Sequence, residues 1–63
     1  MNLDDLKREL ARTKALMRIT RRSLLNAASE EVRTVFTKKL MKLAEKKLEI
    51  QAEILRNEKS LLP

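Results

Sequence analysis

Residues 24–31 read Leu-Leu-Asn-Ala-Ala-Ser-Glu-Glu, and this stretch decides the fold. Asn26 can end a helix because asparagine tolerates the left-handed backbone conformation when glycine is missing. Ser29 can cap a following helix, and the glutamates after it, Glu30 and Glu31, suit the positive end of that helix's dipole. The stretch therefore predicts a corner over residues 26–29 between two helices.

The composition of the whole chain favours helices and argues against strands. The 63 residues include no glycine, and the single proline is the last residue. Without these residues a chain cannot easily form the tight turns that join strands. Leucine, lysine, arginine, glutamate and alanine dominate, and these are strong helix formers. We therefore predict an all-α protein with a single helical-hairpin domain over residues 1–63. Because we find neither an apolar run of about 20 residues nor a signal-peptide pattern, we expect a cytoplasmic protein.

Apolar residues recur at helical spacing on both sides of the corner. The first helix is predicted over about residues 3–25, with Asn2 as its cap, and the second over about 30–58, with a short tail at 59–63. Thr13 and Thr20 share the apolar face of the first helix, where we expect their hydroxyls to bond back to their own backbone. The stripe of the first helix is Leu3, Leu6, Leu10, Met17 and Leu24, and that of the second is Phe36, Leu40, Leu43, Ile50 and Ile54.

The phase of the two stripes distinguishes a hairpin from one continuous helix. Ala27 and Ala28 favour helix, so a single rod is a real alternative. If the first stripe is continued in sevens, however, it meets polar residues such as Glu31, Lys38 and Glu45. The phase break indicates that the chain reverses at the corner and that the two long helices run antiparallel.

The apolar surface of the second helix is too wide for one neighbour. Its apolar residues span an arc of about 200°, whereas packing on a single helix needs about 100°. The second helix is also longer than the first, so its far end has no cover within the hairpin. We therefore predict a homodimer of hairpins that forms a four-helix bundle. The predicted interface residues are Met41, Leu48, Leu55 and Leu62.

Lys47 interrupts the apolar stripe of the second helix. Its stem could cover apolar surface while its amine reaches solvent. Alternatively, it could pair with Glu9, because facing positions in this hairpin sum to about 55. Such a pair would help to fix the register of the helices.

The first helix carries a dense basic face. Residues 7–22 contain seven cationic side chains and one acidic one, and the chain has a net charge of +6. Such a face attracts an acidic protein partner or the phosphate backbone of a nucleic acid. A membrane surface is a weaker alternative because the helix lacks Trp and Phe. The predicted contact residues are Lys7, Arg8, Lys14, Arg18, Arg21 and Arg22.

Catalytic chemistry fits the sequence poorly. The chain has no His, Cys, Tyr or Trp and no glycine-rich phosphate loop, so we predict a protein that is not an enzyme and holds no cofactor or metal. Glu45, Glu49 and Glu53 are spaced by four, but Lys42 and Lys46 interleave with them, which favours a surface ion-pair ladder. We therefore expect a helical interaction and assembly module, or alternatively a nucleic-acid-binding accessory protein.

Overall fold

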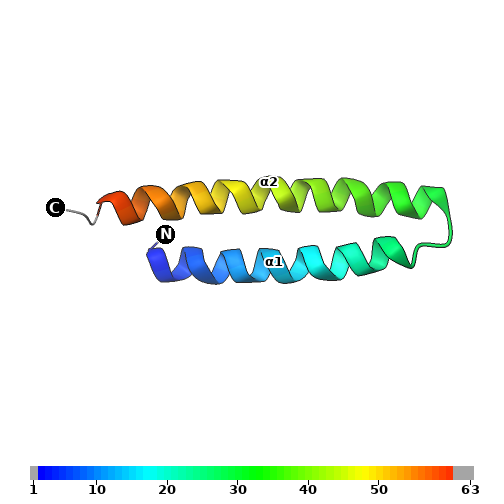
Figure 1. Cartoon of the computed structure of the whole chain (residues 1–63), viewed down its shortest axis with the longest axis horizontal. Coiled ribbons are helices and arrows are strands. Elements are labelled where there is room, and N and C mark those ends of the chain that lie inside the picture. The colour runs from blue at the N-terminus through cyan, green and yellow to red at the C-terminus, as the bar shows by residue number, and fades with distance from the viewer. Residues whose placement is uncertain (1, 61–63) are drawn as a thin grey trace.

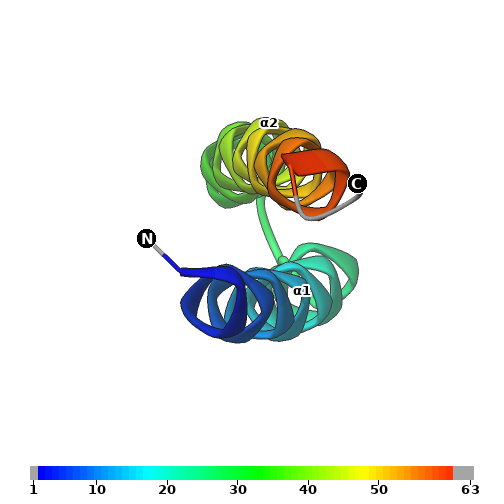
Figure 2. The same ribbon diagram turned by 90° about the vertical axis from the view of Figure 1, so that its left-hand side faces the viewer.

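Two helices and the corner between them make up the described chain. The structure, a computed structural model, describes residues 2–60. Helix α1 covers Leu3–Leu25 and helix α2 covers Glu30–Ser60 (Figure 1). Viewed along its length, the molecule shows the two helices side by side, with the corner joining them at one end (Figure 2).

The overall dimensions settle the question of hairpin against rod. The molecule measures 53 × 14 × 14 Å. A continuous helix over residues 3–60 would be about 87 Å long, at 1.5 Å per residue. The prediction of an antiparallel helical hairpin is therefore confirmed, and the single rod is wrong.

Helix α1 begins where the sequence predicts. The Asn2 side-chain carbonyl oxygen accepts a hydrogen bond of 2.8 Å from the Asp5 backbone N–H. Asp4 and Asp5 lie in the first turn, where the helix dipole favours negative charge. Asn2 is therefore the N-cap of α1.

The corner ends α1 without a residue of positive φ. The Asn26 N–H donates to the Arg22 carbonyl at 3.2 Å, and the Ala27 N–H donates to the Leu24 carbonyl at the same distance. Asn26 has φ −96° and ψ 3°, and no residue within the described chain has a positive φ. The expected left-handed conformation of Asn26 is therefore wrong, because these two bonds satisfy the last carbonyls of α1 without it.

Helix α2 begins as predicted and ends later. The Ser29 hydroxyl accepts a hydrogen bond of 3.2 Å from the Val32 N–H, which confirms Ser29 as the cap. The helix continues to Ser60, two residues beyond the predicted end at 58. Asn57 and Ser60 do not break it, since both side chains donate to backbone carbonyls one turn back. The remaining predicted tail residues, 61–63, lie outside the described residues.

The core is a narrow seam between the helices. Leu6 and Thr13 are each only 1% exposed, and Met17, Thr20 and Ile50 are also buried. The hydroxyls of Thr13 and Thr20 donate to the carbonyls of Glu9 and Leu16 at 2.8 and 2.7 Å. Both threonines therefore lie buried in the seam with their hydroxyls hydrogen-bonded to their own backbone, as predicted. The rest of the α2 stripe is half-buried, namely Phe36, Leu40, Leu43 and Ile54.

Candidate interaction surfaces

An apolar stripe runs along α2 outside the seam. Met41, Leu48 and Leu55 are 61%, 66% and 54% exposed. Seven residues complete almost two helical turns, so the three side chains follow one line along the helix. Leu62, the fourth residue predicted for this surface, lies outside the described residues. We call Met41, Leu48 and Leu55 the outer stripe, and α1 leaves it open to solvent.

The predicted basic face of α1 is exposed along its length. Within residues 2–60 the structure contains two ion pairs, and Glu9 makes both of them, with Arg12 and with Lys46. None of the six cations of the face therefore makes an ion pair within the described part of the chain. We call its six residues the basic stripe: Lys7, Arg8, Lys14, Arg18, Arg21 and Arg22.

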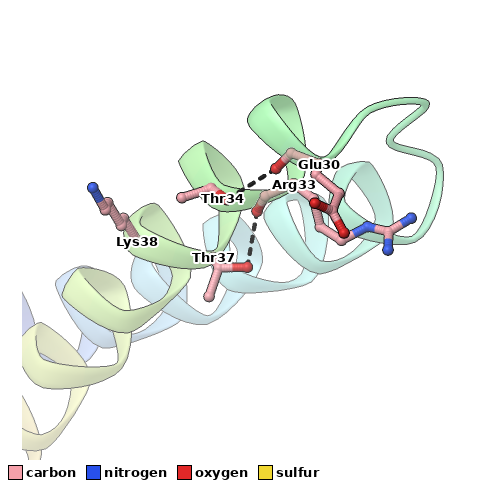
Figure 3. Close-up of a pocket in the computed structure, with 5 residues that line it drawn as sticks. All are labelled: Glu30, Arg33, Thr34, Thr37 and Lys38. Carbon is pink, nitrogen blue, oxygen red and sulfur yellow. Dashed lines mark hydrogen bonds between the residues drawn. The ribbon is translucent and has the colours of Figure 1, made fainter.

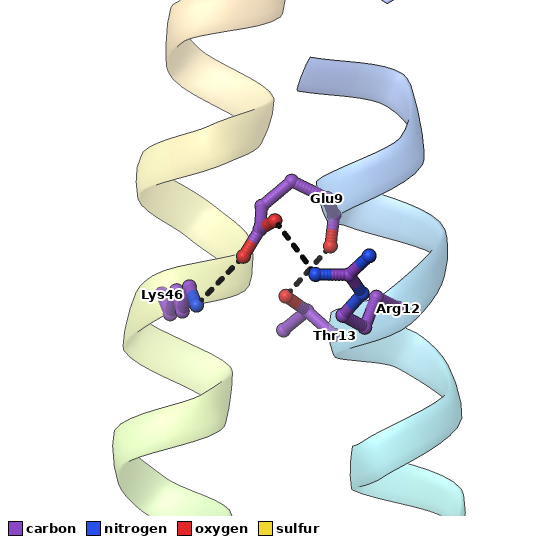
Figure 4. A network of polar contacts seen from close by, with 4 residues as sticks. All are labelled: Glu9, Arg12, Thr13 and Lys46. Atoms are coloured by element: carbon purple, nitrogen blue, oxygen red, sulfur yellow. Dashed lines mark hydrogen bonds and ion pairs between the residues drawn. The ribbon is translucent and has the colours of Figure 1, made fainter. Parts of the chain in front are cut away.

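Glu9 joins the two helices through a small polar network (Figure 4). One carboxylate oxygen lies 2.8 Å from the Lys46 amine, and the other lies 3.8 Å from the Arg12 guanidinium. The hydrogen bond from Lys46, together with its positive charge, lowers the pKa of Glu9 below its ordinary value. The alternative in which Lys47 pairs with Glu9 is therefore wrong, because the neighbouring residue, Lys46, makes the ion pair across the hairpin.

Lys47 lies at the seam without an acidic partner. It is half-buried, and it makes no ion pair within residues 2–60. Together with Met17 and three cations of α1, it lines a pocket of about 170 Å³; the three cations are Lys14, Arg18 and Arg21. Lys47 therefore shares its pocket with one apolar side chain, Met17, and with three cationic ones.

The predicted ion-pair ladder on α2 is absent. Among the described residues, Glu45, Glu49 and Glu53 make no ion pair with Lys42 or Lys46. Lys46 instead reaches across the hairpin to Glu9. The same part of the chain holds no cluster of three acidic, histidine or cysteine side chains that could bind a metal ion.

A surface hollow lies on the first turns of α2 (Figure 3). It has a volume of about 460 Å³ and is lined by Glu30, Arg33, Thr34, Thr37 and Lys38. The hydroxyls of Thr34 and Thr37 donate to the carbonyls of Glu30 and Arg33, at 2.9 and 2.8 Å. Because all the lining residues come from one helix and the hydroxyls bond to that helix, the hollow lacks the convergent polar groups of a ligand site.

Sequence reasoning missed an apolar groove near the corner. Leu16 and Ile19 of α1 line it with Phe36 and Leu43 of α2, around a volume of about 250 Å³. Leu16 and Ile19 are both exposed. The signal was present in the sequence, since these two apolar residues stand outside the seam spacing of α1.

Comparisons with protein-family models, with curated proteins and with solved structures find no match to this chain. No helix within residues 2–60 is long and apolar enough to cross a membrane.

Proposed function

We propose that this protein is a non-enzymatic helical assembly module that self-associates through α2 and presents the basic stripe of α1 to an acidic partner. The observation that carries the proposal is the outer stripe. Three large apolar side chains in one line are exposed in the isolated hairpin, and such a line on a surface helix is typical of an interface. A second hairpin packed against it would complete a four-helix bundle.

The strength of this association follows from the size of the stripe. Full burial of a leucine or methionine side chain contributes roughly 1.5–3 kcal/mol. More than half of each stripe side chain is still exposed, so burial in a dimer recovers more than half of this contribution for each residue. Association also costs several kcal/mol in lost freedom of motion. We therefore expect a dimer that dissociates on dilution.

Sedimentation equilibrium over a range of protein concentrations tests the proposal. We expect the native chain to shift from monomer toward dimer as its concentration rises, and Leu48→Lys with Leu55→Lys to stay monomeric. Val35→Lys is the matched control, because Val35 is an exposed apolar residue of α2 outside the stripe. A native chain that stays monomeric at all concentrations would overturn the proposal. So would a control that dissociates as fully as the stripe variant.

The basic stripe supports a second candidate function, binding to the phosphate backbone of a nucleic acid. From Lys7 to Arg22 the stripe is about 22 Å long, at 1.5 Å per residue. Its six cations have no acidic partner within the described residues. Each phosphate that such a side chain neutralises releases counterions, which drives binding.

Fluorescence anisotropy of labelled duplex DNA and of an RNA stem-loop tests this candidate. We expect binding that weakens steeply with salt and is lost in Arg18→Glu with Arg22→Glu. Lys38→Glu with Lys42→Glu on α2 changes the net charge equally and serves as the control. If both double variants lost binding equally, the nucleic acid would be attracted by the net charge of the protein, and the basic stripe would not be the contact surface.

A further inference from the structure

The pocket at the middle of the hairpin gathers cations from both helices. Lys14, Arg18 and Arg21 come from α1, and Lys47 comes from α2. The pocket also reaches the buried side chain of Met17. Four cationic residues therefore line one open pocket of about 170 Å³, and none of them has an ion-pair partner within residues 2–60.

Lys47 is the unusual member of this cluster. It occupies a half-buried position of the seam, in a stripe whose other members are apolar. Its neighbour Lys46 reaches Glu9 at 2.8 Å, so the hairpin supplies a carboxylate to the exposed lysine and none to the half-buried one. An anion that enters the pocket could contact all four cations and would offset their mutual repulsion. Because the described chain supplies no carboxylate to them, such an anion would come from outside it.

The donor set fits a phosphoryl group better than a carboxylate. Four cations can satisfy a group with two negative charges and three acceptor oxygens, whereas a carboxylate offers one charge and two oxygens. Two of the four are arginines, whose forked donors suit phosphate oxygens. The pocket volume of about 170 Å³ is roughly ten times the 10–15 Å³ or so that one water needs, so a phosphoryl group can enter it.

We propose that Lys14, Arg18, Arg21 and Lys47 form a binding site for a phosphoryl group. This inference deepens the nucleic-acid candidate and rests on it for a macromolecular source of the phosphate. It does not depend on self-association. The phosphoryl group could be the terminal group of a free phosphate compound, with up to two charges and three free oxygens. It could also belong to a nucleic-acid backbone, where each phosphodiester has one charge and two free oxygens and the four donors would bind adjacent phosphates.

Calorimetric titration with sodium tripolyphosphate tests the site, with ionic strength held constant by NaCl. Lys47→Met is the test variant, because it keeps an unbranched stem and removes the charge. We expect this variant to unfold at a higher temperature without ligand, and to bind tripolyphosphate roughly tenfold or more weakly, as expected for the loss of one charge-assisted hydrogen bond. Lys42→Met removes one charge elsewhere on α2 and should bind about as tightly as the native chain.

Two results would overturn the site. One is binding by Lys47→Met that equals binding by the native chain. The other is an aspartate-rich peptide of the same net charge that binds as tightly as tripolyphosphate, since this would remove the preference for phosphoryl oxygens.

A parallel titration with a single-stranded DNA oligonucleotide distinguishes the two sources. If Lys47→Met weakens the binding of both ligands, the pocket binds the nucleic-acid backbone. If Lys47→Met weakens the binding of tripolyphosphate alone, the pocket binds a free phosphate compound. If the native chain binds tripolyphosphate and no nucleic acid, the second candidate function fails while the phosphoryl site stands.

Discussion

Helix α2 carries two apolar stripes, and the hairpin covers only one of them. Ile50 in the seam is 6% exposed, whereas Leu48 in the outer stripe is 66% exposed, although the two residues are separated by a single position. Both are large aliphatic side chains in stripes with helical spacing. The difference lies in the neighbour: α1 packs on the seam, and no described segment packs on the outer stripe.

This difference teaches that the spacing of apolar residues shows how many faces of a helix can pack against other helices, but not which helices those are. Within the chain, α1 packs on one of the two apolar stripes of α2. The other stripe is the basis of the proposed self-association. The two stripes should therefore respond differently to substitution and to protein concentration.

The largest expected effect comes from truncating the seam. Ile50→Ala should lower the free energy of unfolding by about 2–5 kcal/mol, because it removes buried methyl groups and leaves a cavity. Leu48→Ala should change it by less than about 0.5 kcal/mol in dilute solution, as is usual for an exposed site. Urea unfolding followed by circular dichroism measures both. Similar losses in the two variants at low concentration would contradict the contrast between the stripes.

A smaller effect is expected from the cap that precedes both stripes. Ser29→Ala removes the hydroxyl that accepts from the Val32 N–H. We expect a loss of about 1 kcal/mol in unfolding free energy, as for other N-cap substitutions. Because the cap lies outside both stripes, the association of folded chains should not change. Weaker self-association of folded Ser29→Ala, measured by sedimentation, would mean that the corner contributes to the interface.

The smallest effect should come from the ion pair that joins the helices beside the seam. The folded-state pKa of Glu9 is lowered, so its contribution to stability is present above the unfolded-state pKa and is lost as pH falls through the folded-state pKa. The native chain should therefore be more stable than Glu9→Gln at neutral pH, and this difference should shrink between about pH 5 and about pH 3. Parallel urea titrations of the two chains measure it. A difference that is constant over this range would exclude the Lys46 contact as its source.

Much of the fold follows from local signals in the sequence. Ser29 with the glutamates after it predicts the start of α2, and the phase break at the corner predicts the reversal of the chain. The predicted end of α2, at about residue 58, is two residues too early. In the structure the side chains of Asn57 and Ser60 bond back to the helix and do not interrupt it.

The candidate surfaces were predictable only in part. The spacing of Met41, Leu48 and Leu55 identifies the outer stripe from the sequence alone. The partner of Glu9 was missed by one residue, because one residue along a helix turns a side chain by about 100°. The meeting of Lys47 with Arg18 and Arg21 was missed for the same reason, since it depends on how each helix is rotated about its own axis.

Thiol labelling at two positions of α2 tests the central claim most directly. The chain has no cysteine, so Leu48→Cys and Ile50→Cys each introduce a single thiol. We predict that the thiol at position 50 reacts slowly with an alkylating reagent at every protein concentration. The thiol at position 48 should react fast in dilute solution and more slowly as the concentration rises. A thiol at position 48 that reacts equally fast at all concentrations would contradict self-association through the outer stripe.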